Sequence, residues 1–379
     1  MRLLLIALFA MAAFAAPPLQ FEEHTLANDL TGGYQVVSCD VNGDGKLDLI
    51  ALASGMSDLV WFENPKWERH VMATGLPRMI NLACWSAKPH AVPEIAVANE
   101  FSMHAAESEG VVSLLTPNGD PRSPWKATVI DRLPASHRLR WADIDGTGEK
   151  VLVNAPLTDA DAHAPDYRGH VPIVYYRPGE WKRQIISDGE EGIVHGIFIT
   201  DWDDDGRDEI LIGSFSGIHL YEFGQNGKWS RREIAKGSPA PWPKSGTSDI
   251  AVGMLEKERF LATIEPWHGN QVVVYRHHAG VWTREVIDDS LLDAHNVGIA
   301  DLNGDGRDEI VAGFRGKPYG VYVYTWDNAK WRRQVLDHGT VSAAGCTIAD
   351  FDGDSRPDIA CIGSATHNLK LYRNLGAGK

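Results

Sequence analysis

The sequence lacks long apolar runs and is poor in cysteine. None of its apolar segments is long enough to cross a bilayer, which excludes a membrane-spanning helix. There are 4 cysteines in 379 residues and no C-x-x-C pair, which excludes a thiolate metal site. We expect the four to be small buried hydrophobic residues rather than disulfides: Cys39, Cys84, Cys346 and Cys361.

An excess of positive charge is also missing. The formal net charge is −15, which argues against nucleic acid as a partner. Much of the negative charge lies in short acidic loops, where bound cations would cancel part of it. The chain has no linker and no low-complexity tract, so we expect one domain over residues 17–379.

The first sixteen residues have the pattern of a secretory signal. Arg2 gives the positive start, Leu3–Ala12 the apolar stretch, and Ala13-Phe14-Ala15 a small-x-small cleavage site. We therefore expect residues 1–16 to be removed and the mature protein to be soluble, in a periplasm or outside the cell.

A nine-residue acidic loop is repeated four times, each copy after a short apolar strand. Acidic or amide side chains occupy positions 1, 3, 5 and 9, and a glycine-permitted turn lies between them. Oxygen ligands at this spacing suit Ca²⁺, but the position-12 glutamate and helical flanks of helix–loop–helix sites are absent. The predicted structural calcium ligands are Asp40, Asn42, Asp44 and Asp48; Asp201, Asp203, Asp205 and Glu209; Asp301, Asn303, Asp305 and Glu309; Asp350, Asp352, Asp354 and Asp358.

These loops have an alternative interpretation. Aspartate and asparagine side chains also form hydrogen-bonded Asx turns that hold no ion. A decayed copy at Asp143–Glu149 has Val151 at position 9, so we expect it to bind calcium weakly or not at all.

A second repeat predicts the architecture. Seven strand-like segments begin with an aromatic residue and recur about every 50 residues, from Phe21–Leu26 to Trp331–Leu336. Such a period with short alternating strands is typical of a β-propeller with four-stranded blades. After Asp350–Asp358 only two strand patterns follow, so the N-terminal segment is the spare strand. We predict an all-β, seven-bladed propeller whose last blade is completed by residues 21–26.

Histidines recur at one position of this repeat. His137, His195 and His295 each precede the first aspartate of their loop by six residues, which places them at the channel mouth opposite the calcium loops. His268 lies in a loop between the second and third strands of blade 5, on that same face. Converging imidazoles suit Zn²⁺ with one open position. The alternative is a polar channel lining bound to water.

Other groups on this face are candidates for supporting chemistry. Tyr34 occupies in blade 1 the position that histidine holds in three other blades, and is a candidate for proton exchange. Glu265 is a candidate base, with a hydrogen-bonding role in its own turn as the alternative. Arg315 and Lys317 would supply positive charge. Aromatic faces for stacking on a sugar ring would come from Trp141, Tyr167 and Trp267.

The acidic loops and the strands after them resemble FG-GAP or VCBS repeats. The strands are Leu49–Leu52, Ile210–Phe215 and Ile310–Phe314. The resemblance implies the propeller fold and says little about function, because such propellers include adhesion modules, lectin-like domains and lyases.

Three stretches are similar to the propeller domain of the aldos-2-ulose dehydratase family: His195–Ile197, Glu265–Tyr275 and Ala294–Asn296. The resemblance implies a zinc site with His195, His268 and His295 as ligands and elimination of water from a keto-sugar such as 1,5-anhydrofructose. This chain ends after one propeller, without the cupin and lectin-like domains of the fungal enzymes, so elimination alone is implied.

The sequence thus favours a secreted zinc-dependent carbohydrate dehydratase or lyase, with His137, Glu265, Tyr34 and Arg315 as candidate catalytic residues. A non-catalytic glycan- or protein-binding propeller and a metal-free polysaccharide lyase are the alternatives. A small carbohydrate or oligosaccharide is the expected partner, and a monomer is the default assembly.

Overall fold

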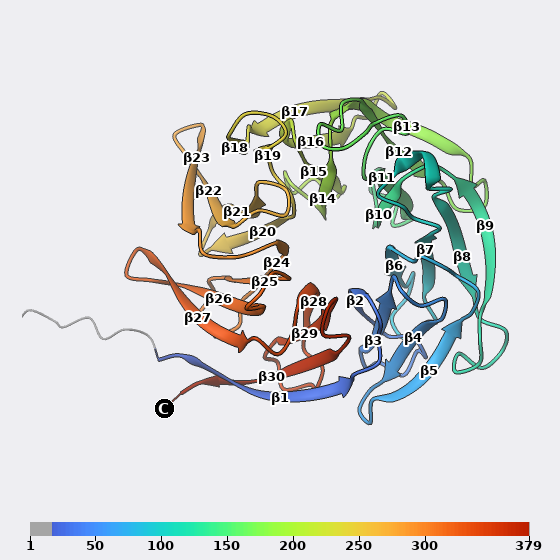
Figure 1. Ribbon diagram of the computed structural model, residues 1–379, viewed down its shortest axis with the longest axis horizontal. Coiled ribbons are helices and arrows are strands. Elements are labelled where there is room, and N and C mark those ends of the chain that lie inside the picture. The colour runs from blue at the N-terminus through green and yellow to red at the C-terminus, as the bar shows by residue number, and fades with distance from the viewer. Residues whose placement is uncertain (1–16, 379) are drawn as a thin grey trace, which may run out of the picture.

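The computed structural model describes residues 17–378, so the predicted signal segment lies outside the described part of the chain. Seven four-stranded antiparallel sheets are arranged as a ring around a central channel (Figure 1). The predicted seven-bladed propeller is confirmed. Among the described residues, no helix has the length and apolar character needed to cross a membrane.

Each of the first three blades runs outward from the channel in chain order. Blade 1 comprises β2 (Gly33–Cys39), β3 (Asp48–Ala53), β4 (Leu59–Glu63) and β5 (Glu68–Ala73). Blade 2 comprises β6 (Asn81–Trp85), β7 (Glu94–Asn99), β8 (Val111–Thr116) and β9 (Lys126–Arg132), with a 3₁₀ turn, η1 (Ala105–Glu107), before β8. Blade 3 comprises β10 (Ser136–Ala142), β11 (Val151–Pro156), β12 (His170–Tyr176) and β13 (Arg183–Glu191).

The next three blades repeat this order. Blade 4 comprises β14 (Val194–Thr200), β15 (Glu209–Ser214), β16 (Gly217–Phe223) and β17 (Trp229–Ala235), and a two-stranded sheet follows it, β18 (Ser238–Pro239) and β19 (Ser245–Gly246). Blade 5 comprises β20 (Ile250–Leu255), β21 (Glu258–Glu265), β22 (Gln271–His278) and β23 (Val281–Asp288). Blade 6 comprises β24 (Ala294–Ala300), β25 (Glu309–Phe314), β26 (Gly320–Asp327) and β27 (Lys330–His338).

Blade 7 is built from both ends of the described chain. Its strands are β28 (Ala343–Ala349), β29 (Asp358–Gly363), β30 (Leu369–Ala377) and, outermost, β1 (Leu19–Ala27). In Figure 1 the blue β1 lies beside the red β30. The two strands are antiparallel, and Leu19 lies opposite Ala377. The predicted completion of the last blade by the N-terminal strand is confirmed, and it leaves no broken blade in the ring.

The core lies between neighbouring blades. One buried cluster joins Ile50 and Trp61 of blade 1 to Ile95 and Val97 of blade 2, and similar clusters join the other blades. The second strands are buried along their whole length, as in β3, β15 and β25, because both of their faces pack on neighbouring sheets. Continuous apolar runs in these strands follow from this double burial.

Two disulfides correct the expectation of free cysteines. Cys39 at the end of β2 is bonded to Cys84 in β6, which ties blade 1 to blade 2 beside the channel. Cys346 and Cys361 are directly opposed in β28 and β29 and form the second bond. Whether two cysteines can form a disulfide depends on how far along its own strand each one lies. The alignment of neighbouring strands and blades sets these positions, and sequence separation alone does not.

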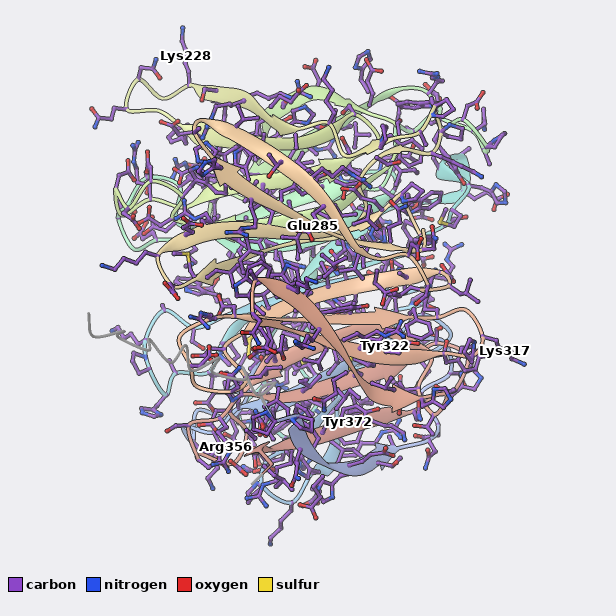
Figure 2. All side chains as sticks on the ribbon, turned by 90° about the vertical axis from the view of Figure 1, so that its left-hand side faces the viewer. Lys228, Glu285, Lys317, Tyr322, Arg356 and Tyr372 are labelled. Atoms are coloured by element: carbon purple, nitrogen blue, oxygen red, sulfur yellow. A yellow bond between two sulfur atoms is a disulfide. The ribbon has the colours of Figure 1, made fainter. Side chains whose placement is uncertain are left out.

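The two faces of the disc carry different loops. Connections between first and second strands hold the acidic loops, and connections between second and third strands emerge at the other face. In Figure 2, which views the disc from its side, Arg356 of an acidic loop and Lys317 of a second-to-third connection lie at opposite edges. The side that holds Lys317 is called the mouth face below.

Candidate functional site

A β-bulge places one residue of each of five inner strands at the channel mouth. The pairing between first and second strands skips one residue at the same place in blades 1, 3, 4, 6 and 7. A bulge leaves its extra residue unpaired and re-aims its side chain. The skipped residues are Tyr34, His137, His195, His295 and Ala344. The position at which the sequence repeats a histidine or tyrosine is therefore the position of a β-bulge.

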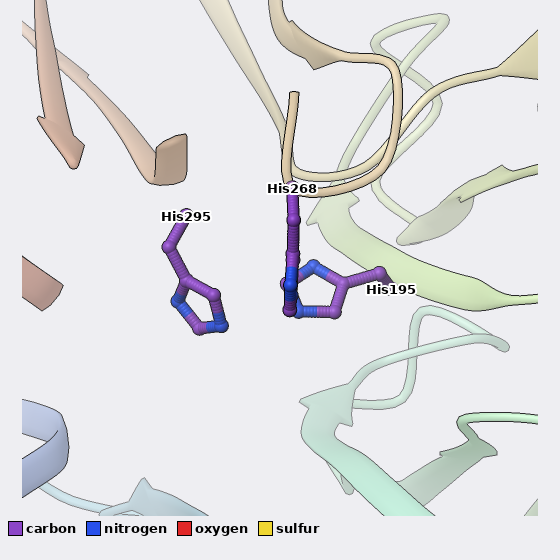
Figure 3. A group of neighbouring side chains, drawn as sticks. All are labelled: His195, His268 and His295. Carbon is purple, nitrogen blue, oxygen red and sulfur yellow. The ribbon is translucent and has the colours of Figure 1, made fainter. Parts of the chain in front are cut away.

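Three histidines converge there. The rings of His195, His268 and His295 point toward one another in Figure 3. Their ring centroids are 5.2 Å apart for His195 and His268, 5.0 Å for His268 and His295, and 4.8 Å for His195 and His295. One nitrogen from each ring lies within 4.8 Å of the other two. The structure therefore brings together the three side chains that the sequence singled out as zinc ligands.

Local backbone features aim two of these rings. His195 is followed by Gly196, where a Cβ would lie 2.3 Å from the carbonyl oxygen of Ser248, so only glycine permits this close approach of blades 4 and 5. His268 has φ of 49°, a left-handed conformation that is uncommon for a side-chain-bearing residue. Such conformations persist where the surrounding structure holds them, and they gather at functional sites.

Each ring has a partner at Nδ1. The Nδ1 of His295 donates to the carbonyl oxygen of Ala344 at 2.5 Å, and the Nδ1 of His195 is 3.1 Å from the hydroxyl of Ser248. The Nδ1 of His268 is 3.2 Å from Nη2 of Arg315. Among residues 17–378, the buried Nε2 atoms of His268 and His295 have no hydrogen-bond partner. His295 thus has the usual surroundings of a metal-ligating histidine, an Nδ1–H donated to a carbonyl and a free Nε2 lone pair. Arginine can only donate, so the partner that can fix His268 in the same tautomer is Oδ1 of Asp293, 3.5 Å from its Nδ1.

All four channel histidines are neutral at pH 7. Burial, and then the charge of Arg138, holds the pKa of His137 and of His195 well below the ordinary value. Burial and the charge of Arg315 do the same for the pKa of His295, and they lower the pKa of His268 to about 3. Neutral imidazole is the form that binds a metal ion or accepts a proton.

Tyr34 and His137 form a hydrogen-bonded pair beside the cluster. The Tyr34 hydroxyl is 2.8 Å from Nε2 of His137, and its ring packs edge-on against His295 with centroids 5.1 Å apart. Burial raises the pKa of Tyr34, so the phenol keeps its proton and donates it to the neutral imidazole. This arrangement can pass a proton between the tyrosine and the histidine.

The mouth opens into a cavity of about 530 Å³. Tyr34, His137, His195 and His268 line it, together with residues from the second-to-third connections of blades 1, 2, 3, 5, 6 and 7. Its cationic groups are Arg78 and Arg315, and its apolar wall includes Phe101 and Trp267. The volume is within the range of small-molecule sites.

Glu265 lies outside this cavity lining, in a repeated structural clamp. The hydroxyl of a third-strand tyrosine in each of blades 3 to 7 donates to a carboxylate that also faces a cation. Glu265 is fully buried and accepts from Tyr275 at 2.6 Å, Thr263 at 2.9 Å and Arg284 at 2.8 Å. The other tyrosine–carboxylate pairs are Tyr176–Asp131, Tyr221–Glu190, Tyr324–Asp288 and Tyr372–Asp337. The repetition favours the structural role of Glu265, with side-chain partners in place of the backbone ones expected.

The remaining supporting residues separate into two groups. Arg315 lines the cavity, and Trp267 does too, with Tyr167 packed edge-on against it at 5.7 Å between centroids. Trp141 is elsewhere: it packs against Trp85 and lines a different cavity of about 490 Å³ in the channel. The proposal that Trp141 stacks on a sugar at the mouth is therefore wrong, because β10 carries it toward the acidic-loop face.

Sequence reasoning missed Arg138. This side chain is 7 % exposed, and it donates from Nε to the carbonyl oxygen of His195 at 2.8 Å. Its Nη2 is 3.3 Å and 3.2 Å from the two ring nitrogens of His195. Arg138 and Arg140 alternate with Leu139 and Trp141 in the inner strand β10, and that pattern could have indicated two cations facing the channel.

The acidic loops have a common internal geometry. The position-1 carboxylate accepts backbone N–H groups within its own loop, as Asp40 does from Gly43 and Gly45. The position-9 carboxylate closes the loop onto position 2, as Asp48 does with the N–H of Val41 at 2.9 Å. Three carboxylates come within 4.8 Å of one another in two loops: Asp201, Asp203 and Glu209, and Asp350, Asp352 and Asp358.

Fold and site together define a seven-bladed β-propeller with a histidine cluster at one mouth of its channel. Residues 109–278 match the family model described as "Aldos-2-ulose dehydratase, beta-propeller domain", and residues 301–361 match that of an FG-GAP-like repeat. The chain is therefore a propeller with FG-GAP-like repeats that resembles the propeller domain of aldos-2-ulose dehydratase. The first match contains His195 and His268.

One curated relative of the chain is itself named aldos-2-ulose dehydratase. The chain is 26 % identical over 236 residues to aldos-2-ulose dehydratase of Phanerodontia chrysosporium, a match that covers 55 % of this chain and 26 % of the relative. The aligned region thus spans about a quarter of that protein. The relationship is distant and is to a carbohydrate dehydratase.

Two solved structures show the same fold. A 6-phosphogluconolactonase candidate from Bacteroides fragilis has a TM-score of 0.51 and 14 % identity, covering 88 % of this chain and 96 % of its own. BBS1N, solved in complex with ARL6DN, has a TM-score of 0.56 and 14 % identity, covering 95 % of this chain and 97 % of its own. At this identity the likeness concerns the fold alone.

Proposed function

We propose that His195, His268 and His295 bind one zinc ion and that the mouth cavity eliminates water, or an alcohol, from a keto-sugar such as 1,5-anhydrofructose. The observation that carries the proposal is the convergence of one nitrogen from each of His195, His268 and His295 within 4.8 Å of the other two, with the buried Nε2 atoms of His268 and His295 unpartnered among residues 17–378. Three imidazoles and an open fourth position are a common catalytic zinc arrangement. The distant relationship to aldos-2-ulose dehydratase supports the same chemistry.

The chemistry divides between the ion and the chain. A bound zinc ion would act as a Lewis acid on the carbonyl oxygen of the sugar. Tyr34 and His137 would move protons: the phenol exchanges a proton with the substrate while the neutral imidazole takes up or returns the phenolic proton. Asp293 would accept from the Nδ1–H of His268 while pairing with Arg315, and Trp267 would offer an apolar face to the sugar ring.

Calcium and export complete the proposal. The convergent carboxylates of Asp201, Asp203 and Glu209, and of the equivalent set in blade 7, support calcium ions that pin the hairpins. The two disulfides support an oxidising compartment, which agrees with a secreted or periplasmic protein.

A metal-free lyase is the second candidate, and the Tyr34–His137 pair favours it. A phenol 2.8 Å from a neutral imidazole can carry out proton abstraction and return without an ion. The two candidates differ in whether the cluster of three histidines is needed as metal ligands.

Elemental analysis of the purified chain, dialysed against a weak chelator, tests the zinc proposal. We expect about one zinc per chain. His268→Ala and His295→Ala should lower the zinc content at least tenfold, because each removes one of three ligands. His277→Ala is the matched control, since His277 is exposed on the outermost half of blade 5 and should leave the zinc content unchanged.

The outcome selects between the candidates. Zinc bound at the cluster together with elimination from a keto-sugar supports the metal-dependent enzyme. Calcium without zinc in an active preparation would contradict the zinc site and leave the metal-free lyase.

A further inference from the structure

The mouth cavity is lined by cations and no acids. Of the residues of chain 17–378 that line it, Arg78 and Arg315 are charged, His137, His195 and His268 are imidazoles, and none is aspartate or glutamate. The whole sequence has 51 acidic and 36 basic residues. A cavity free of carboxylates in so acidic a chain is a local reversal of charge, which attracts anions.

Arg315 has donor capacity that the protein does not use. Its Nη2 contacts Asp293 at 3.1 Å and His268 at 3.2 Å, while its buried Nε has no hydrogen-bond partner within the described chain. The Arg315 side chain is 18 % exposed, whereas Asp293 is 42 % exposed. Asp293 is thus the more hydrated partner, and Arg315, which lines the cavity, keeps one N–H donor that no group of residues 17–378 uses.

The second cation of the cavity is also paired with a carboxylate outside the cavity lining. Arg78 pairs with Glu100, and both side chains are partly exposed, at 47 % and 27 %. Glu100 does not line the cavity, whereas Arg78 does. Surface pairs of this kind are weak, so Arg78 can turn to a better anion without much loss.

A third cation lies just behind the histidines. Arg138 is buried against His195, and its charge acts on Asp249, a buried carboxylate that lines the channel and not the mouth cavity. Arg140 acts on the same carboxylate, so two cations share one buried acid and a bound anion near the cluster would balance the second charge.

We infer that the natural ligand of the mouth cavity is a sugar acid, in which a carboxylate pairs with Arg315 and Arg78 while the ring lies against Trp267. This inference rests on the proposed function and narrows its substrate from a neutral keto-sugar to an anionic one. Arginine matches carboxylate geometry with two parallel donors, which a neutral hydroxyl cannot use equally.

The elimination remains balanced on such a substrate. The C–H bond next to the carbonyl or carboxylate breaks, and its electron pair forms the new carbon–carbon double bond. The C–O bond at the next carbon breaks at the same time, and the departing oxygen leaves as water or an alcohol with one proton. No oxidant or reductant is needed.

Binding titrations on the full mature chain test the inference. The probes are charge-matched pairs, the methyl glycosides of glucuronate, galacturonate and mannuronate against those of the three parent hexoses. We expect at least one uronate to bind about tenfold or more tightly than its neutral partner, the factor expected of a charge-assisted hydrogen bond. Arg315→Gln and Arg78→Gln should each reduce this preference. Arg307→Gln, on the acidic-loop face, should not.

The outcomes separate this inference from the zinc proposal. Equal binding within all three pairs, or a preference for the neutral sugars, would overturn the sugar-acid inference whether or not zinc is bound. A uronate preference in a chain that holds no zinc would support the anion site and count against the metal. A preference that survives both cavity variants would also overturn the inference, because other groups would then supply it.

Discussion

Single residues at the mouth are held in one protonation state by their neighbours. Burial and the charges of Arg138 and Arg315 keep the histidines neutral, and burial keeps Tyr34 protonated. A neutral imidazole next to a protonated phenol is ready to accept a proton at pH 7, and neutral ligands can bind a cation without first losing protons. The two arginines therefore favour both metal binding and proton transfer in the proposed chemistry.

Two conservative variants separate catalysis from stability at this scale. Tyr34→Phe removes the hydroxyl from His137, so we expect turnover to fall by about 10²–10⁴-fold with little change in melting temperature.

Glu265→Gln leaves Arg284 without its carboxylate, so we expect a loss of about 1–3 kcal/mol in unfolding free energy. Turnover and urea denaturation of both variants check this. A stable Glu265→Gln protein without activity would make Glu265 the base instead.

The sequence predicted the histidine cluster more completely than its surroundings. His195 and His295 share one register of the repeat, and His268 lies in a second-to-third connection on the same face, so position along the chain predicts position in the ring. Ser248, Ala344 and Arg138 come from other strands, so their contacts with these rings appear only when the blades are packed. Glu265 was ambiguous because its neighbours in space, not in sequence, saturate it.

Two polar arrangements, the acidic loops and the tyrosine–carboxylate clamps, recur from blade to blade in the propeller. The acidic loops close the hairpins on one face. Most of the tyrosine–carboxylate clamps join the third strand of one blade to the fourth strand of the blade before it, whereas Glu265 lies on the second strand of the same blade as Tyr275. Buried position-9 carboxylates face a conflict without a cation: burial raises the pKa of Asp48 and of Glu209 to about 7, and that of Glu309 to about 8. A calcium ion would resolve the conflict by stabilising the ionised form.

The pH dependence of stability tests the calcium loops. A carboxyl whose folded pKa is raised contributes stability that is complete below its unfolded pKa of about 4 and is lost as pH rises through the folded value. The buried histidines act in the opposite sense, because their lowered pKa values make the fold more stable as pH rises toward about 6.5. The loops are therefore tested by the change that calcium causes at each pH. We expect added calcium to raise the melting temperature by at least about 3 °C more at pH 8 than at pH 4.5.

Magnesium at the same concentration is the control for that measurement, because it requires a smaller octahedral site. A melting temperature that ignores calcium at pH 8, or that calcium raises equally at pH 4.5 and 8, would contradict the calcium assignment and favour plain Asx turns.

The whole molecule depends on closure of the ring. β1 completes blade 7 against β30, and Gln334 of blade 6 bonds the backbone of Leu19 at 3.0 Å and 2.6 Å. The Cys39–Cys84 bond joins blades 1 and 2, the first two blades after this closure. One strand from the N-terminal part of the chain thus holds the two ends of the ring together.

Removal of residues 17–27 tests this closure. Without β1 the edge of β30 is exposed, so we expect a lower melting temperature and self-association, measured by calorimetry and size-exclusion chromatography. Because Leu19 lies opposite Ala377, the same segment attached after residue 378 through a short turn can pair again in the antiparallel sense. This permuted chain should recover stability. A truncated chain as stable and monomeric as the parent would show that closure is unimportant.

The sequence by itself determined the number of blades, the order of their strands, the face of each loop and the ring position of the histidines, because each of these is a property of a repeat read along the chain. The tertiary structure alone decided which groups surround each ring, which cysteines are bonded, where Trp141 and Glu265 lie, and that the mouth cavity lacks acids. Those features arise between blades, where residues about 50 positions apart meet, and packing rather than periodicity sets their contacts.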